Sequence, residues 1–219
     1  MKAVRLQLAL RTLLNPAAPQ WQKVPEEVIP LVGTPLHLQP TRYIRTAWAD
    51  RLIGAVRAVR VKVAFSSTHI FFRLQWQDPN HNVDYGDGTT FPDAAAILFP
   101  INGDAPLLTM GSPDSPVNAW FWRANLRAPQ NLVAHGLGSV EKAEGPPLWA
   151  QATWTDNEWH LVLARALGEG NFSAVALMPG REVKVAFAIW EGGNQERGGL
   201  KAFSQQWRIL QVGQGRGQL

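Results

Sequence analysis

The sequence has 219 residues and contains no cysteine. Disulfide bonds, cysteine-ligated zinc, iron–sulfur clusters held by this chain and thioether attachment of a c-type haem are therefore excluded. Charged residues make up only 17% of the chain, below the roughly 25% typical of soluble domains. We expect other proteins to cover part of a surface with so little charge.

Long hydrophobic runs are also missing. No apolar stretch approaches the roughly 18 residues that a membrane-spanning helix needs. The first residues, MKAVRLQLALRTLL, resemble a signal peptide only loosely, because Arg5 and Arg11 interrupt them and no A-x-A-like cleavage site follows. We therefore expect no membrane span, and a chain that is cytoplasmic, already processed, or exported together with a partner.

Familiar catalytic and nucleic-acid-binding motifs are absent as well. The sequence has no G-x-S-x-G, no H-E-x-x-H and no P-loop lysine motif. Its net charge of +4 comes from scattered Lys and Arg residues, so we expect no nucleic-acid partner. Asp84, Asp87 and Asp93 are acidic residues that could bind calcium, but they lack the EF-hand pattern and are more typical of a solvated turn.

Alternation of apolar and polar residues dominates what is present. Residues 57–65 and 69–76 alternate on either side of a short polar turn, which predicts a β-hairpin. A second hairpin is predicted within residues 151–167, with its turn at Thr155 to Glu158. Further strands are expected at residues 3–10, 181–190 and 203–212.

Many short strands separated by Gly- and Pro-rich loops favour a mainly β fold, a β-sandwich of largely antiparallel strands with a few short helices in loops. Residues 78–96 and 104–118 have no strong period, so we expect functional loops or short helices there. No linker divides the chain, which favours one domain over residues 1–219. Residues 213–219 are predicted to be a frayed tail.

The ten tryptophans allow a first functional hypothesis. Aromatic platforms on β-sandwiches stack on sugars, so a carbohydrate-binding module is one interpretation of the sequence. The alternative is that residues such as Trp76, Trp190 and Trp207 fill the core, and for each strand taken alone this alternative is favoured.

Two segments carry a more specific signal. In LLTMGSPDSPVNAWFWRAN, residues 107–125, Met110 stands at the end of an apolar run, just before a turn. A methionine that fills a gap in a core more often lies inside an element. In AFAIWEGGNQERGGLKAFSQQW, residues 186–207, Lys201 follows a glycine-rich loop and precedes another apolar run. Taken alone, Lys201 is a surface lysine or a buried functional one.

Together the two segments resemble the haem b-binding γ subunits of ethylbenzene dehydrogenase and its relatives. These relatives include dimethylsulfide dehydrogenase, selenate and chlorate reductases and steroid-hydroxylating dehydrogenases, whose γ subunits are partners of molybdenum enzymes of the dimethylsulfoxide reductase superfamily. The shared pattern is T-M-G, then P-V-N-x-W-x-W, and later A-F-A-x-W-x-G-G-N-x-E-R-x-G-x-K. Both blocks occur in this order.

The resemblance implies a non-covalently bound haem b, held between loops at the edge of the sandwich. It implies that Met110 and Lys201 are the axial ligands of the haem iron, and that Asn118 and Trp120 shape the pocket. Asn118 would bond the backbone of the Met110 loop, and Trp120 would form a wall beside the haem. Lysine must lose its proton to bind iron, whereas the methionine thioether has none to lose. With both axial positions filled, the haem would carry electrons and perform no substrate chemistry.

The implied function is that of an electron-transfer subunit, a b-type cytochrome that is not catalytic alone. Its partners would be an iron–sulfur β subunit, a molybdenum-cofactor α subunit, and an external cytochrome or other electron carrier, and its location would be the periplasm. Two alternatives stay open at this point. One is a tryptophan-rich carbohydrate-binding module without haem, and the other is a scaffold subunit that kept the fold and lost the cofactor.

Overall fold

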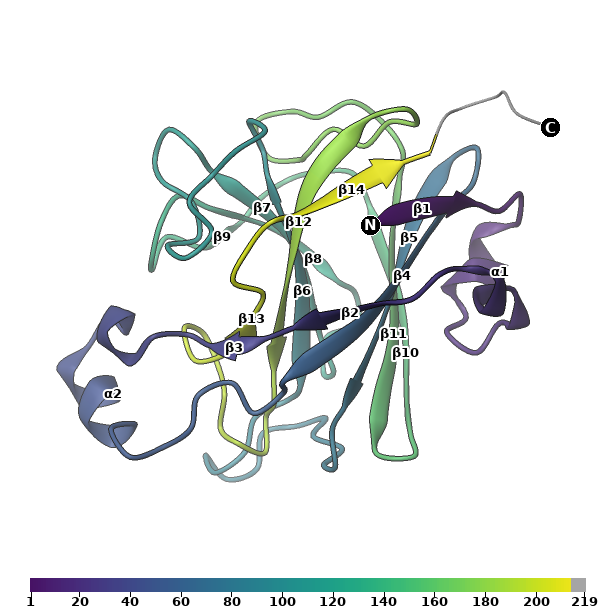
Figure 1. Cartoon of the computed structure of the whole chain (residues 1–219). Coiled ribbons are helices and arrows are strands. Elements are labelled where there is room, and N and C mark those ends of the chain that lie inside the picture. Colours follow the sequence, from purple (N-terminus) through teal and green to yellow (C-terminus); the bar gives the residue numbers. More distant parts are fainter. Residues whose placement is uncertain (214–219) are drawn as a thin grey trace.

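A computed structural model of the chain describes residues 1–213, so residues 214–219 of the predicted tail lie outside the described residues (Figure 1). Within the described residues, fourteen strands join in one sheet that folds back on itself. The path runs β10-β11-β5-β4-β1-β14-β12-β6-β7-β8-β9, and β2, β3 and β13 pair beside it. The strands are β1 Lys2–Arg5, β2 Glu27–Pro30, β3 Val32–Gly33, β4 Ala58–Phe65, β5 His69–Gln77, β6 Ala94–Pro100, β7 Val117–Arg123, β8 Gln130–Ala134, β9 Glu141–Lys142, β10 Leu148–Thr155, β11 Glu158–Ala166, β12 Glu182–Trp190, β13 Ala202–Phe203 and β14 Arg208–Val212.

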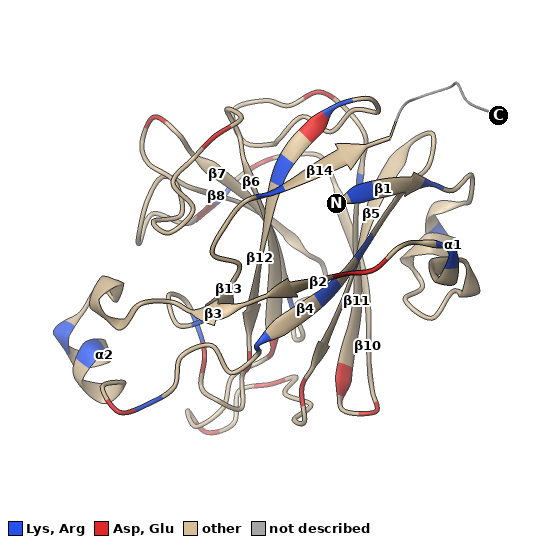
Figure 2. Cartoon of the chain, in the orientation of Figure 1, with Lys and Arg blue, Asp and Glu red and all other residues tan. Residues whose placement is uncertain are grey.

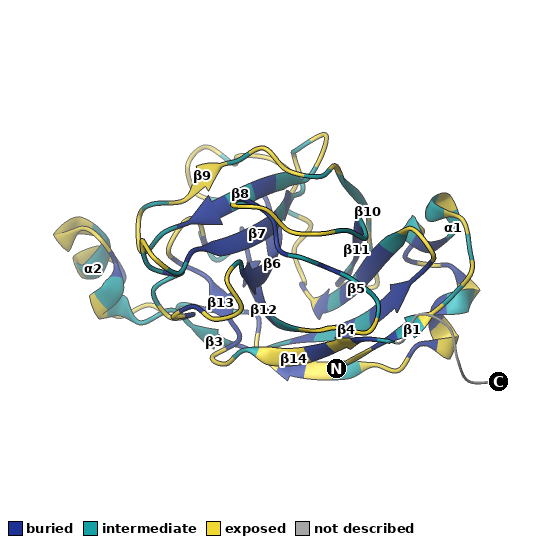
Figure 3. Ribbon diagram, turned by 90° about the horizontal axis from the view of Figure 1, so that it is seen from above, coloured by how far each residue is buried: buried dark blue, intermediate teal, exposed yellow. Residues whose placement is uncertain are grey.

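The two halves of this path form the two layers of a β-sandwich, as Figure 3 shows from above. β10, β11, β5 and β4 belong to the first layer, and β12, β6, β7 and β8 to the second. β1 and β14 connect the layers, and β1 pairs in parallel with both β4 and β14. The other named strand pairs are antiparallel. The predicted fold class is therefore confirmed.

Both predicted hairpins are present. β4 pairs with β5 from Arg60, opposite Gln75, to Phe65, opposite Ile70. β10 and β11 are joined by Asp156 and Asn157, whose φ angles of 54° and 59° are those of a two-residue hairpin turn. Asp and Asn tolerate this left-handed backbone better than most residues, and this explains why the chain turns there.

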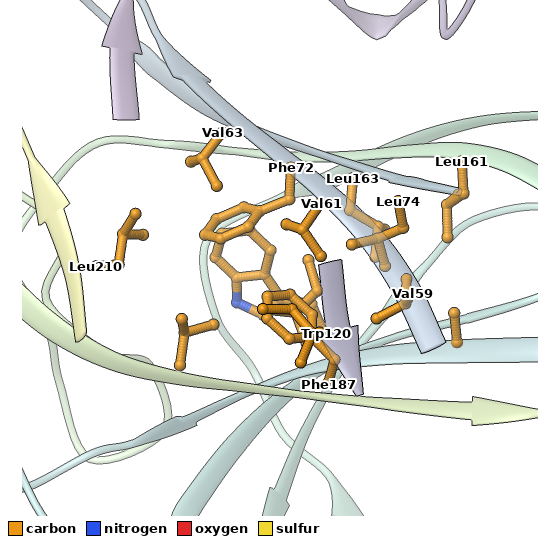
Figure 4. Packing of buried hydrophobic residues seen from close by; sticks show 14 of the residues in the cluster. Val59, Val61, Val63, Phe72, Leu74, Trp120, Leu161, Leu163, Phe187 and Leu210 are labelled. Carbon is orange, nitrogen blue, oxygen red and sulfur yellow. The ribbon is translucent and has the colours of Figure 1, made fainter. Parts of the chain in front are cut away.

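The core lies between the layers. The residues that alternate inward from β4 and β5 meet those from β7 and β12, as Figure 4 shows for Val61, Phe72, Trp120 and Phe187. All four side chains are at most 1% exposed. Burial of each large apolar side chain contributes about 1.5–3 kcal/mol before chain entropy is subtracted, so this alternation is the main reason that the sandwich forms.

The helices lie in the N-terminal part of the chain, and residues 78–96 and 104–118, for which functional loops or short helices were expected, contain no helix. The predicted strand at residues 3–10 ends at Arg5, and the chain then forms a short helix. Leu13 from this helix is fully buried beside Phe71 and Val162 on the outer face of the first layer. Tertiary burial thus overrides the alternating pattern there. The helices are α1 Leu10–Leu14, α2 Arg42–Ala47, and the 3₁₀ turns Pro19–Lys23 and Leu36–Leu38.

Helix α2 stands away from the sandwich on a long excursion between β3 and β4 (Figure 1). Thr41 begins the helix by accepting a 3.2 Å hydrogen bond from Ile44 N, which is a typical N-cap. Arg42 and Arg45 make this helix basic, as Figure 2 shows. None of the helices in the part of the chain that the structure describes is long and apolar enough to cross a membrane.

Candidate functional site

A cavity of about 600 Å³ lies on the outer face of the second layer, on the opposite side of the strands from the core. Its floor is apolar and lined by alternate residues of β6 and β7, among them Ala94, Ala96, Ala119 and Phe121. The three alanines leave room above the strands where larger side chains would fill it. The volume is within the range of about 300–1,000 Å³ that is typical of pockets for small molecules and cofactors.

Met110 lines one side of this cavity from a tight turn. Its φ of 59° is in the left-handed region, which residues with a Cβ adopt at a cost. The turn is fixed by a 3.2 Å hydrogen bond from Gly136 N to Met110 O. Gly111 follows with φ of 88°, and a Cβ there would come within 2.9 Å of Ser115 O and Ala134 O. The glycine of T-M-G is thus required by the close approach of backbone, and the turn presents Met110 to the cavity.

Lys201 lines the same cavity from the loop that joins β12 to β13. Its backbone is anchored to the start of the long excursion, because Thr34 N donates a 3.0 Å hydrogen bond to Lys201 O. The residue is 7% exposed, and its Nζ lies 5.5 Å from the centre of the Trp190 ring. Among the described residues, Nζ has no hydrogen-bond acceptor and no ion-pair partner.

This environment changes the chemistry of the lysine. Burial in an apolar wall disfavours the charged form and lowers the pKa of Lys201 from 10.5 to about 8. About a tenth of the amine is therefore neutral at pH 7, far more than for a lysine with the ordinary pKa, and its lone pair is free of any hydrogen bond among the described residues. The cavity thus holds a soft thioether from Met110 and a readily deprotonated amine from Lys201, two residues far apart in sequence.

Two arginines at the cavity were not singled out from the sequence. Arg123, at the end of β7, and Arg197, in the loop after β12, both line it. The Arg197 guanidinium lies 4.2 Å from the centre of the Phe91 ring, and that of Arg123 lies 5.7 Å from the Tyr85 ring. Neither arginine forms an ion pair with a carboxylate among the described residues, so two positive charges are available to an anionic group at this place.

Glu196 fixes the loop that carries Lys201. This carboxylate is 1% exposed and accepts hydrogen bonds of 2.8 Å from the backbone N–H groups of Gly54 and Ala55, and one of 3.1 Å from Glu191 N. Burial raises the pKa of Glu196, and these hydrogen bonds oppose the rise. The glutamate of the E-R-x-G-x-K block therefore ties the loop after β12 to the base of the α2 excursion, a role that the sequence pattern alone did not reveal.

Asn118 lies where the sequence did not place it. Residues alternate along β7, and Asn118 faces away from the cavity with no exposed surface. Its amide donates to Asn131 Oδ1 at 2.7 Å and to Leu132 O at 3.1 Å, and its oxygen accepts from Val175 N at 3.4 Å. The expected hydrogen bond to the Met110 loop is not among these. Asn118 instead joins neighbouring strands from behind the cavity.

Trp120 shares this orientation. It is fully buried in the core, 5.6 Å between ring centres from Phe72 and 5.0 Å from Phe99. The Arg165 guanidinium lies 5.2 Å from the indole ring. Trp120 therefore does not line the cavity, and the expectation that it stands beside the haem is corrected: strand alternation directs it to the opposite face. Trp190 lines the cavity in its place.

The three acidic residues considered from the sequence as a calcium site do not share one environment. Asp84 and Asp87 are exposed, whereas Asp93 is buried beside Asp78 and Glu191. Burial, and then the charge of Asp93, raise the pKa of Asp78 to about 8. Burial likewise raises the pKa of Asp93 to about 6. Asp78 and Glu191 could not be grouped with Asp93 from sequence, because the three residues come from three separate strand ends.

Comparison with known proteins decides the family. A model of the family described as Ethylbenzene dehydrogenase matches residues 18–146 and 140–202, which include both Met110 and Lys201. The chain belongs to the ethylbenzene dehydrogenase family. Among curated members of similar sequence, chlorate reductase subunit gamma of Ideonella dechloratans is 36% identical over 195 residues, covering 88% of this chain and 77% of that protein.

Two further relatives of this ethylbenzene dehydrogenase family member are also named as oxidoreductase subunits. A protein of Haloferax mediterranei named as a respiratory nitrate reductase haem subunit is 30% identical, covering 92% of this chain and 69% of that protein. Dimethylsulfide dehydrogenase subunit gamma of Rhodovulum sulfidophilum is 28% identical, covering 90% and 75%. All three relatives are named as subunits of larger oxidoreductases.

Solved structures support the architecture. A family 9 carbohydrate-binding module from Caldicellulosiruptor kristjanssonii in complex with glucose superposes on this ethylbenzene dehydrogenase family member with a TM-score of 0.55, covering 100% of this chain and 98% of that one. The sequence identity is 8%. A carbohydrate-binding protein from Bacteroides uniformis gives a TM-score of 0.51 at 11% identity. At such identities the likeness concerns the β-sandwich alone and does not favour sugar binding.

Proposed function

We propose that this chain is a haem b-binding electron-transfer subunit of a molybdenum oxidoreductase complex, with Met110 and Lys201 as the axial ligands of the haem iron. The observation that carries the proposal is the position of the Lys201 amine, buried without a polar partner in the apolar cavity that Met110 also lines. The names of the relatives, which are γ or haem subunits of reductases and a dehydrogenase, support the same assignment.

The donor set fits haem iron. An amine binds a metal only through its lone pair, so a lysine ligand must be neutral, and burial already lowers the pKa of Lys201 to about 8. The thioether of Met110 needs no deprotonation and favours reduced iron, which raises the reduction potential. Because these two residues would occupy both axial positions, no position is left for a substrate or oxygen.

The rest of the cavity fits the shape and charge of the cofactor. Haem b, when bound, supplies a one-electron couple. The alanines of β6 and β7 leave a flat apolar space, and Trp190 closes part of its wall. Arg123 and Arg197 are the cationic side chains that we assign to the haem propionates, because the structure gives neither of them a carboxylate partner within residues 1–213. No covalent attachment is needed, in agreement with the absence of cysteine.

The complex around the subunit follows from the same assignment. Substrate chemistry would take place on a molybdenum cofactor in an α subunit, and an iron–sulfur β subunit would exchange electrons with this chain. An external cytochrome or another electron carrier would be the second redox partner. We place the complex in the periplasm and treat residues 1–219 as one haem-binding domain.

An absorption spectrum tests the proposal directly. The full chain, expressed with haem available, should show a sharp Soret band and sharp α and β bands on reduction, as expected for six-coordinate low-spin haem. A pyridine haemochrome assay should report haem b, extractable with acid–organic solvent. A colourless protein that does not take up added haemin would contradict the haem assignment.

Isolation from native cells tests the complex. The chain should copurify with an iron–sulfur subunit and a large molybdenum subunit, and metal analysis of the preparation should show molybdenum and excess iron. A native preparation that contains haem but runs as a monomer without partner chains would support the haem assignment and exclude the proposed complex.

A further inference from the structure

Three buried carboxylates meet at one end of the sandwich. Asp78 follows β5, Asp93 precedes β6 and Glu191 follows β12. One carboxylate oxygen of each residue lies within 4.8 Å of one from each of the others. All three residues are at most 6% exposed, and none of the three carboxylates forms an ion pair with Lys, Arg or His within residues 1–213.

Hydrogen bonds satisfy only part of this cluster. Asp93 accepts from Gly192 N at 2.8 Å, Asn82 N at 2.9 Å and Trp159 Nε1 at 3.0 Å, which favours its ionised form. Glu191 accepts from backbone N–H groups of its own loop, at 3.1 Å from Gly193 and 2.6 Å from Asn194. All of these donors are uncharged, so the three carboxylates face one another without a cationic side chain beside them in the part of the chain that the structure describes.

Two oxygen atoms in the same place have no donor. Asp78 has no exposed surface, and its Oδ1 accepts a 3.1 Å hydrogen bond from Asn80 N. Its Oδ2 has no donor within hydrogen-bond distance, although the indole N–H of Trp76, which is also without a partner, favours the ionised carboxyl and opposes the rise of its pKa. The amide oxygen Asn82 Oδ1 is also buried without a partner. A Cβ at Gly193 would come within 2.7 Å of Glu191 Oε1 and 3.0 Å of Asn82 Oδ1, so these two oxygens approach the same point. Orphaned buried acceptors are costly and require an explanation.

We propose that Asp78, Asp93 and Glu191, with the amide oxygen of Asn82, form a binding site for one divalent cation, calcium in preference to magnesium. A cation satisfies both orphaned oxygens and neutralises the carboxylates together, whereas a single shared proton can serve only one pair. Oxygen ligands select hard cations. Calcium takes six to eight oxygen ligands, whereas magnesium usually keeps several waters and takes only one or two carboxylates. Three buried carboxylates and an amide oxygen therefore form a ligand set that suits calcium better.

A cation at this site would stabilise the strand ends that border the cavity. Asp93 directly precedes Ala94, and Glu191 directly follows Trp190, and both Ala94 and Trp190 line the cavity. A bound cation would therefore cross-link the ends of β5, β6 and β12 and hold the start of the loop that leads to Lys201. It would stabilise the haem-free and the haem-bound chain alike, which separates this proposal from the proposed function.

Calcium binding to the full-length chain tests the site. After treatment with EGTA and removal of the chelator, titration with calcium should show one saturable site by calorimetry and raise the midpoint of thermal unfolding, with a smaller effect for magnesium. Asp78→Asn removes one charged ligand and should weaken calcium binding on the order of tenfold or more. Asp84→Asn changes an exposed carboxylate in the same loop and should bind calcium like the wild type.

Each other outcome overturns the proposal. If calcium neither binds stoichiometrically nor shifts the wild-type midpoint, the cluster is held neutral by protons, and Asp78→Asn should then be as stable as the wild type or more so. If Asp84→Asn loses binding while Asp78→Asn keeps it, the cation binds at the exposed loop. Because the wild-type titration decides between binding and no binding, the proposal stays testable even if Asp78→Asn does not fold.

Discussion

Lys201 Nζ lies 5.5 Å from the centre of the Trp190 indole ring. Within residues 1–213, this cation–π contact is the interaction that can stabilise the charged form of the amine. A cation over an indole gains about 0.5–2 kcal/mol, which is less than the cost of burying an unpaired ammonium group. The amine is therefore under pressure to lose its proton, and the cavity prepares it for a role that a surface lysine could not have.

Lys201 variants should separate ligation from packing. Lys201→Ala should convert the ferric low-spin spectrum to a five-coordinate or water-ligated one. Lys201→Arg should not restore it, because the guanidinium keeps its charge and offers no lone pair. In the wild type, acid should displace the lysine before the protein unfolds, and Lys201→Met should lack this step because a thioether does not titrate. An unchanged low-spin spectrum in Lys201→Ala would exclude Lys201 as a ligand of the haem iron.

Met110 variants should alter the haem without unfolding the protein. Met110→Ala removes the thioether, so we expect a lower reduction potential and faster loss of haem to an acceptor such as apomyoglobin. Met110→Gly removes the same ligand but also relieves the left-handed backbone, and it should be more stable than Met110→Ala by about 1 kcal/mol. A wild-type potential in both variants would exclude Met110 as a ligand, and His135, which adjoins the cavity residue Gly136, would be the next residue to replace.

The haem-free protein should become more stable as pH rises through the alkaline range. The pKa of Lys201 is about 8 in the folded chain and 10.5 as the ordinary value, so between these values the unfolded state binds more protons. The free-energy cost of burying the charged amine is therefore constant below about pH 8 and is lost progressively between about pH 8 and 10.5, so the free energy of unfolding rises in this window. Urea unfolding of the haem-free wild type and Lys201→Met should show the difference between them shrinking across this window. A pH-independent difference would mean that folding does not lower the pKa of Lys201.

Asn118 should matter for stability and not for the haem. Asn118→Ala leaves Asn131 Oδ1 and Val175 N–H without their partner, and we expect a loss of about 2–4 kcal/mol in the free energy of unfolding. Haem affinity and reduction potential of the folded variant should match the wild type. Asn102→Ala, at an exposed turn, is the control and should change stability by less than about 0.5 kcal/mol. A shifted potential in Asn118→Ala would show that this residue does act on the cavity.

The sandwich itself could be predicted from sequence because burial of alternate residues is a local pattern. Val59, Val61 and Val63 alternate along one strand, and all three point into the core. The helix at Leu10–Leu14 escaped prediction, because the burial of Leu13 depends on a surface supplied by Phe71 and Val162, which are distant in sequence.

The candidate site, like the fold, could be predicted from sequence only in part. The family pattern located Met110 and Lys201, and the structure brings both to one cavity. The same pattern did not indicate which face of the strand Asn118 and Trp120 occupy, although strict alternation with Ala119 and Phe121 determines it. Of the carboxylate cluster, only Asp93 was named from the sequence as a possible calcium-binding residue, because Asp78 and Glu191 become its neighbours only when three strand ends meet.

The turn at Met110 has a consequence for how this protein can change over generations. Most random substitutions destabilise a protein, and selection normally removes those that fall below a threshold. At Met110, with its φ of 59°, replacement by glycine relaxes the backbone, so selection for stability alone would favour losing the methionine. At this position, selection for stability and selection for the thioether therefore oppose each other. A lineage that no longer needs the thioether should lose the methionine early.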